Sequence, residues 1–392
     1  MALPLEGIRV LDLSQLLPGS LCTQILADLG AEVLKIENPK GGDIFRWTPP
    51  LVKTLGSFFH VTNRNKKGMK LNLRDPEGRK IFLKMVPQAD VLLDNFRPGA
   101  MQRMGLGYED LKKINPHLIY CSLTGFGQDG PYRDRAAHDL NFLSLSGVLD
   151  LLGEKGGRPI VPAVQIAGAG GGSINAALGI LASLLRRERT GAGQYLDVAI
   201  LDGLNPFLAL SMSQYLADGQ LPRRGETLVG GGYAFYNVYE TSDGKYLALG
   251  SLEEKFWAEF CRAIDREDLI AEQFAPAPRQ DELIDEVRSI IRQKTRQEWI
   301  DLLSQYDTCF SPVNTLEEAL QDPHIQHRGL WFKGFHPVDG EVGQLRFPIK
   351  FSEDQPGWRM PAPSFGEHTE EILRRQGYDA DEIADLATRG II

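Results

Sequence analysis

The sequence predicts an α/β protein with a Rossmann-like large domain and a smaller α+β domain. Three observations lead to this class. Short apolar runs alternate with helical patterns through the first third of the chain, which is typical of parallel strands joined by crossover helices. The composition changes after residue 218 to a stretch rich in glycine and polar residues. The chain of 392 residues is also longer than one ordinary domain needs.

The strands of the large domain are expected where short apolar runs lie between turn signals. Helical patterns separate these runs, and a D-P-E-G turn opens the second helix. The patterns predict strands over 8–13, 32–36, 91–95, 118–123 and 193–200, and helices over 20–28, 75–85, 108–113, 170–188 and through 214–218. Together they predict a doubly wound sheet.

The second part of the chain shows the pattern of a smaller mixed domain. Strands over 238–241 and 245–249 flank a glycine turn and predict a β-hairpin. Helical patterns fill 253–305, a short strand begins at Pro312, and one amphipathic helix is expected near 369–376. The predicted division is 1–218 for the first part of the large domain, 219–234 for a linker, 235–325 for the small domain and 326–392 for the return to the large domain.

Charge and hydropathy argue against nucleic-acid and membrane partners. The net charge is −9 and the pI is near 5.4, so long-range attraction to anionic polymers or lipids is absent. The opening segment, MALPLEGIRVLDL, lacks the basic-then-apolar order of a signal peptide. The apolar stretch 166–185 is about as long as a membrane span, but its glycines and polar residues favour a buried helix. We therefore expect a cytoplasmic protein.

Motifs for metals and dinucleotides are weak. The four cysteines show no C-x-x-C spacing, and His324 and His327 lack a third ligand, so no metal site is predicted. Residues 125–130 fit G-x-G-x-x-G, but Pro131 and charged residues follow instead of a helix. The glycine run 168–173 does precede a helix, which favours close approach of a ligand to the backbone there.

Several blocks of sequence, in a fixed order, carry a resemblance to a known family. They are NRNKKGMKLNLRDPEG (63–78), DNFRPGAMQRMGLGY (94–108), SLTGFGQDGPYRDRAAHDLNF (122–142), RRERTGAGQYLDVAILDG (186–203), YNVYETSDGKYLALG (236–250), DPHIQHRGLW (322–331) and FGEHTEEIL (365–373). In content and order they resemble the family III CoA-transferase (CaiB/BaiF) superfamily, which includes the α-methylacyl-CoA racemases.

The resemblance implies an enzyme with CoA or acyl-CoA as substrate, a carboxylic acid as second substrate, and no permanently bound cofactor. It also implies an interlocked dimer, formed with a second copy or with a paralogous chain, whose active site combines the large domain of one chain with the small domain of the other. By motif, the CoA-contacting positions correspond to Leu71, Arg74, Asn95, Phe96, Arg103 and Met104, and the nearby basic residues Lys66 and Arg97 are candidates for binding its phosphates.

The resemblance also indicates catalytic residues. Transferases of this family use an aspartate at the glycine-rich segment as nucleophile, and the racemases pair that aspartate with a histidine in an A-H-D motif and a supporting glutamate. In this chain His138 and Asp139 stand in the A-H-D motif, and Glu253 in SLEEKF matches the supporting glutamate, so these three are the predicted catalytic residues. Gly168 occupies the position of the aspartate.

Three functions remain open at this point. The chain could be one subunit of a heteromeric CoA-transferase whose paralogous partner supplies the missing aspartate. It could instead be a 2-methylacyl-CoA racemase or epimerase that enolises its substrate with His138, or a non-catalytic CoA-binding subunit. The first hypothesis is preferred because it accounts for both the CoA motifs and the glycine at position 168.

Overall fold

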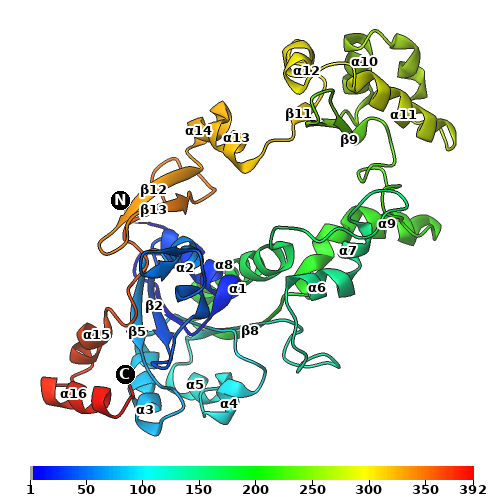
Figure 1. Ribbon diagram of the computed structural model, residues 1–392. Coiled ribbons are helices and arrows are strands. Elements are labelled where there is room, and N and C mark those ends of the chain that lie inside the picture. The colour runs from blue at the N-terminus through cyan, green and yellow to red at the C-terminus, as the bar shows by residue number, and fades with distance from the viewer. Residues whose placement is uncertain (1–2) are drawn as a thin grey trace. The chain divides into compact units, whose positions relative to one another are not determined.

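The computed structural model describes residues 3–392, which form two compact units (Figure 1). Unit 1 consists of the chain up to Leu143, Ala163–Asn205 and Pro323–Ile392, and unit 2 of Ser144–Pro162 and Pro206–Asp322. The return to unit 1 lies close to the predicted position. The predicted division differs from this one because 144–162, 206–218 and the predicted linker 219–234 all belong to unit 2.

Polar contacts explain why residues 144–162 join unit 2. The guanidinium of Arg224 donates hydrogen bonds to the carbonyl oxygens of Asp150 at 2.9 Å and Gly157 at 2.8 Å. Lys155 forms an ion pair with Asp281 at 2.8 Å. These partners lie far apart in the sequence, so pattern analysis does not reveal them.

Unit 1 is built on a six-stranded parallel sheet with the order β5-β2-β1-β6-β7-β8. In chain order this is 3-2-1-4-5-6, the arrangement of the doubly wound Rossmann fold. The predicted α/β class is confirmed, and the ends of the five predicted strands agree to within one residue. The strands are β1 (Arg9–Asp12), β2 (Glu32–Glu37), β5 (Lys66–Lys70), β6 (Val91–Asp94), β7 (Ile119–Thr124) and β8 (Gln194–Ala199).

The edge strand β5 was not predicted. Its sequence, KKGMK, contains no β-branched or aromatic residue, so it lacks the composition typical of strands. It nevertheless pairs with β2 along its whole length and buries the side chains of Lys66 and Met69. Burial of a lysine in this strand is made possible by polar partners, which are described below.

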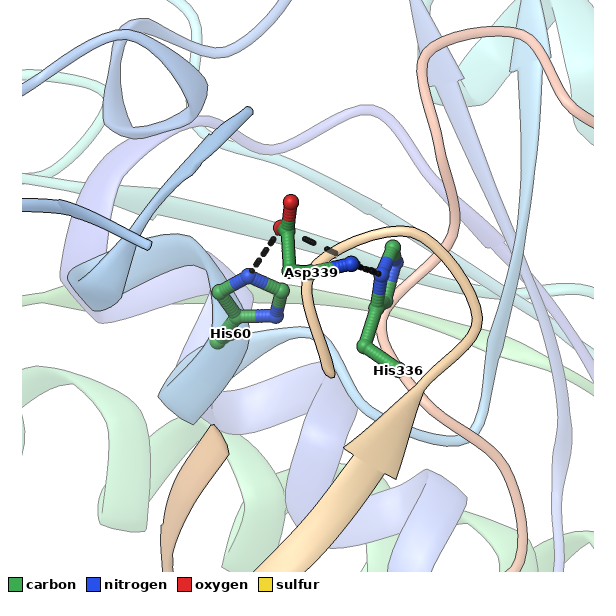
Figure 2. A group of neighbouring side chains, drawn as sticks. All are labelled: His60, His336 and Asp339. Carbon is green, nitrogen blue, oxygen red and sulfur yellow. Dashed lines mark hydrogen bonds and ion pairs between the residues drawn. The ribbon is translucent and has the colours of Figure 1, made fainter. Parts of the chain in front are cut away.

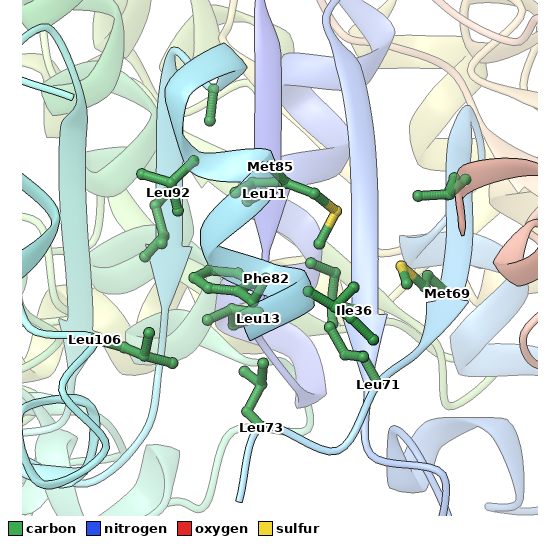
Figure 3. Packing of buried hydrophobic residues seen from close by; sticks show 14 of the residues in the cluster. Leu11, Leu13, Ile36, Met69, Leu71, Leu73, Phe82, Met85, Leu92 and Leu106 are labelled. Atoms are coloured by element: carbon green, nitrogen blue, oxygen red, sulfur yellow. The ribbon is translucent and has the colours of Figure 1, made fainter. Parts of the chain in front are cut away.

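Helices cover both faces of the sheet. On one face α1 (Leu16–Asp28) and α8 (Asn175–Thr190) contact each other and the strands. Side chains of α3 (Pro76–Met85), α5 (Tyr108–Ile114), α15 (Thr369–Arg375) and α16 (Ala380–Thr388) contribute to the main hydrophobic core, where Phe82 and Met85 lie over Leu11 and Ile36 (Figure 3). Asp75 caps α3 by accepting a hydrogen bond from the N–H of Glu77.

The segment Ile166–Thr190 is long and apolar enough, by length and composition, to cross a membrane. It consists of a π-helical part, η3 (Ile166–Ile174), followed by α8. Half of its most apolar window is buried, and α8 packs against β7, β8 and α1. These contacts are those of a helix that covers a sheet.

Unit 2 contains a three-stranded antiparallel sheet with the order β11-β10-β9. Strands β9 (Tyr236–Glu240) and β10 (Tyr246–Gly250) form the predicted hairpin, and β11 (Phe310–Pro312) ends at Pro312, where the predicted short strand was expected to begin. Helices α10 (Glu254–Ala263), α11 (Arg279–Ile291) and α12 (Arg296–Leu303) bury Trp257 and Trp299 against it. Unit 2 also contains α7 (Val148–Leu151), α9 (Ala209–Asp218) and α13 (Leu316–Gln321), and α6 (Asp139–Ser146) spans the boundary between the units. The remaining α-helices and strands belong to unit 1: α2 (Ser57–Thr62), α4 (Ala100–Arg103), α14 (Pro323–Arg328), β3 (Leu51–Val52), β4 (Leu55–Gly56), β12 (Trp331–His336) and β13 (Gly340–Leu345).

The carboxyl group of Asp94, at the end of β6, makes stability depend on pH. It accepts hydrogen bonds from the Ser122 hydroxyl at 3.0 Å and the Phe96 N–H at 3.1 Å, and burial raises its pKa to about 6. A folded pKa above the unfolded one means that stability falls as pH rises from about 4 to about 6. One pKa unit is worth about 1.4 kcal/mol. The free energy of unfolding of Asp94→Asn, relative to that of the wild type, should therefore rise by about 2 to 3 kcal/mol between pH 4 and pH 8.

Urea unfolding of both proteins at pH 4, 6 and 8 measures this effect. Other carboxylates titrate in the same window, but they cancel in the difference between the variant and the wild type. A difference that stays constant over this range would contradict the assignment of the pH dependence to Asp94.

Candidate active site

The amide of Asn95 fixes the loop that follows β1. Its Nδ2 donates to the carbonyl oxygen of Gln15 at 2.6 Å, and its Oδ1 accepts from the Gln15 N–H at 2.9 Å. Strands β1 and β6, which these residues follow, are neighbours at the point where the strand order reverses. Ligands of open α/β sheets bind at the carboxyl ends of strands beside this switch point. Asn95 therefore shapes the expected ligand site, and its direct contact with CoA stays a prediction.

Three arginines in the predicted CoA motifs are available for an anionic ligand. The side chains of Arg74, Arg97 and Arg103 are exposed, and none forms an ion pair with another residue of 3–392. Phe96 and Met104 are half-buried and pack against the main core. Guanidinium groups pair well with phosphate, and a half-buried apolar side chain suits an adenine ring. Their contacts with CoA stay predictions.

Two predicted CoA contacts need correction. Lys66 is fully buried, and its ammonium donates hydrogen bonds to the carbonyl oxygen of Ser20 and to Asn63 Oδ1, both at 2.8 Å, and pairs with Asp12 at 3.2 Å. The prediction that Lys66 binds phosphate is therefore wrong, because its donors are used inside the protein. Leu71 is only 1% exposed and lies in the main core (Figure 3), so its side chain does not reach a ligand.

Gly168 and Asp139 lie side by side in unit 1. The N–H of Gly168, which is buried in η3, donates a hydrogen bond to Asp139 Oδ1 at 2.7 Å. A Cβ at Gly168 would lie 3.5 Å from that oxygen and 3.5 Å from atoms of Leu17 and Pro18, which are ordinary contacts. The sequence placed a glycine where relatives carry an aspartate, but it did not show that another carboxylate stands beside it.

His138 precedes α6, which begins at Asp139. Its backbone N–H donates to Asn141 Oδ1 at 3.0 Å, and its carbonyl oxygen accepts from the Asn141 N–H at 2.9 Å. The imidazole is exposed and makes no hydrogen bond to another described residue. The backbone of this histidine is therefore fixed while its ring stays available to a ligand.

Glu253 belongs to unit 2, where it precedes α10 with an exposed side chain. It lines a cavity of about 720 Å³ together with Lys255, Arg262 and Asp307. Its predicted pairing with His138 in a neighbouring chain stays a prediction.

One group of side chains in residues 3–392 could hold a metal ion. His60, His336 and Asp339 are buried, and one ligand atom of each lies within 4.8 Å of the others (Figure 2). The His60 Nε2 to Asp339 Oδ2 distance is 2.7 Å, which is short for two ligands of one zinc ion, since these lie about 3.3 Å apart in a tetrahedral site. The Nδ1 of His336 already accepts the N–H groups of Val338 and Asp339. These atoms form a hydrogen-bond network without a metal.

Asp339→Asn is expected to lower the free energy of unfolding by about 2 kcal/mol, because the buried carboxylate accepts three hydrogen bonds. Its Oδ1 accepts from the N–H and hydroxyl of Thr54 at 2.9 and 2.7 Å, and its Oδ2 from His60. Burial acts to raise the pKa of Asp339, but these hydrogen bonds outweigh it and hold the pKa below its usual range. Thermal unfolding with and without EDTA should give the same Tm. A lower Tm in EDTA, with metal found by elemental analysis, would contradict the network.

Three comparisons place the chain among known proteins. The sequence matches the profile of CoA-transferase family III over residues 5–369. It is 34% identical to the succinyl-CoA:glutarate CoA-transferase of Mus musculus over 99% of this chain and 90% of that protein. It is also 34% identical to the α-methylacyl-CoA racemase of Homo sapiens, over 99% of this chain and 97% of the racemase. The crystal structure of a CaiB/BaiF family protein from Brucella suis superposes with a TM-score of 0.83 at 32% identity and covers 96% of this chain and 100% of its own.

Proposed function

We propose that this chain, which belongs to CoA-transferase family III and therefore acts on acyl-CoA thioesters, transfers CoA from an acyl-CoA to a carboxylic acid. The observation that carries the proposal is the carboxylate of Asp139 against the glycine-rich segment, since CoA transfer needs a carboxyl group that takes up and passes on the acyl group. Arg74, Arg97 and Arg103 support the CoA half of the site, because they are exposed and form no ion pair within residues 3–392. Succinyl-CoA and a dicarboxylate are the first substrates to test, because relatives of similar length are named for them.

The test combines the purified chain with succinyl-CoA and a series of carboxylic acids that includes glutarate and mesaconate. New CoA thioesters are identified by chromatography and mass spectrometry. Transfer by the chain alone supports the proposal. Transfer only after addition of a paralogous chain supports the heteromer, in which that chain supplies the reactive carboxylate. Absence of any new thioester in both experiments contradicts CoA transfer.

Enolisation of a 2-methylacyl-CoA is a second candidate, favoured by the exposed imidazole of His138 in the A-H-D motif and by the similarity to racemases. In deuterium oxide, such an enzyme introduces deuterium at the carbon α to the thioester. His138→Ala should reduce this exchange about 100-fold, the usual contribution of a general base, and change CoA transfer less than about 3-fold. Mass spectrometry follows both reactions in parallel. Loss of transfer together with exchange would show that His138 is not specific to enolisation.

A further inference from the structure

We propose that Asp139 is the nucleophile of CoA transfer in this chain and takes the role that a glycine leaves vacant at position 168. The inference rests on the proposed function and deepens it by naming the residue that carries the acyl group. It also makes the chain complete for this step, so that no carboxylate from a paralogous partner is needed.

The two oxygens of Asp139 have different environments. Oδ1 accepts the hydrogen bond from Gly168 N–H at 2.7 Å, whereas Oδ2 has no hydrogen-bond partner among residues 3–392. The residue is half-buried, so the group is oriented by the protein but open to a ligand. A carboxylate with one anchored and one free oxygen is suited to attack, because its orientation is fixed and a lone pair remains available.

The position of this carboxylate fits the lost one. An aspartate at position 168 would hold its oxygens about 2.4 Å from its own Cβ, given ordinary bond lengths. The Oδ1 of Asp139 lies 3.5 Å from the Cβ position of Gly168, so it borders the region that those oxygens could occupy. Because Gly168 has no side chain, nothing of its own occupies this space. A carboxylate from α6 therefore reaches the region that a carboxylate from η3 would fill.

The surroundings favour this role over a purely structural one. Asp139 forms no ion pair with a cationic group of residues 3–392, so its charge is not neutralised by that part of the chain. A carboxylate that serves only to cap a helix bonds to the N–H groups of that helix, but Asp139 binds the N–H of another segment. The first turn of α1 contributes Leu17 and Pro18, whose apolar atoms lie against the same region, and η3 packs on α1.

The proposed steps balance in atoms and charge. Oδ2 of Asp139 attacks the carbonyl carbon of the donor thioester, the C–S bond breaks, and CoA leaves as the thiolate from a mixed anhydride with Asp139. The thiolate then attacks the carboxyl carbon of Asp139, which releases the donor acid and leaves an aspartyl-CoA thioester. The acceptor carboxylate repeats both steps in reverse order and departs as the new acyl-CoA. No oxidant, reductant or metal is consumed.

The test compares Asp139→Asn with a control, Asp134→Asn, which changes an exposed acidic residue of the segment before α6. Transfer from succinyl-CoA to glutarate should fall at least about 10,000-fold in Asp139→Asn, as expected for loss of a nucleophile, and less than about 2-fold in the control. The asparagine keeps an oxygen for Gly168 N–H, so thermal unfolding and CoA binding should change little. Wild-type protein treated with succinyl-CoA and hydroxylamine should carry a hydroxamate at Asp139, identified by peptide mass spectrometry.

The outcomes separate this inference from the proposed function. Transfer that survives in Asp139→Asn, or a hydroxamate on another residue, overturns the role of Asp139 and leaves CoA transfer intact. Transfer that requires a paralogous chain and labels that chain likewise overturns it in favour of the heteromer. Absence of transfer and of any label under all these conditions overturns both.

Discussion

Gly168→Asp, introduced into Asp139→Asn, is expected to restore CoA transfer about 100-fold to 1000-fold over the single variant. The substitution returns a carboxylate whose Cβ lies 3.5 Å from the position of Asp139 Oδ1, so the new group enters the same region but not the same place. A misplacement of about 1 Å can cost about 100-fold in rate, so the double variant should remain below the wild type. Gly168 does not adopt a positive φ, and the added Cβ meets its neighbours at 3.5 Å, so the backbone and the packing accept a side chain.

Gly168→Ala in the same Asp139→Asn background is the matched control, because it adds the Cβ without the carboxylate. It should fold like the aspartate variant and show no recovery. The rate of thioester exchange between succinyl-CoA and glutarate measures all three proteins. Recovery with alanine would attribute the effect to packing, and absence of recovery with aspartate would show that the space beside Gly168 is not where the carboxyl group reacts.

Composition and periodicity predicted most of the large unit, because buried parallel strands are continuous apolar runs. β1, β6 and β7 are of this kind. β5 was missed because its burial depends on partners that no local pattern contains. The boundaries of the units likewise depend on distant partners, since residues 144–162 join unit 2 through ion pairs and hydrogen bonds to segments far away in the sequence.

The candidate site was predicted by motif, but its internal geometry was not. His138 and Asp139 share one motif and Gly168 lies in another, 29 residues after Asp139. Only the folded chain shows that η3 places the Gly168 N–H on the Asp139 carboxylate. The sequence therefore suggested a nucleophile supplied by a partner chain. The missing aspartate at position 168 is visible in the sequence, whereas a carboxylate that folding brings beside Gly168 is not.

Removal of one partner from the buried ion pair of Lys66 and Asp12 should strongly destabilise unit 1. Lys66→Met keeps the length of the side chain but leaves the Asp12 carboxylate, fully buried at the end of β1, without its nearest cation. Removal of one partner from a buried pair costs about 3 to 5 kcal/mol, because the remaining charge stays desolvated. The variant also loses the hydrogen bonds that Lys66 donates to Ser20 and Asn63, which lowers the stability further. Urea unfolding of the variant measures this loss.

Lys67→Met, one residue later, is the control, since that side chain is 37% exposed and pairs with Glu371 at the surface at 2.8 Å. Its loss should cost less than about 1 kcal/mol. CoA affinity, measured under conditions where each variant is folded, should change less than about 2-fold in Lys66→Met, because an ammonium inside the protein does not reach a phosphate. If Lys66→Met instead unfolded like the wild type and lost CoA affinity, the lysine would be a ligand-binding residue and the interior role assigned to it would be wrong.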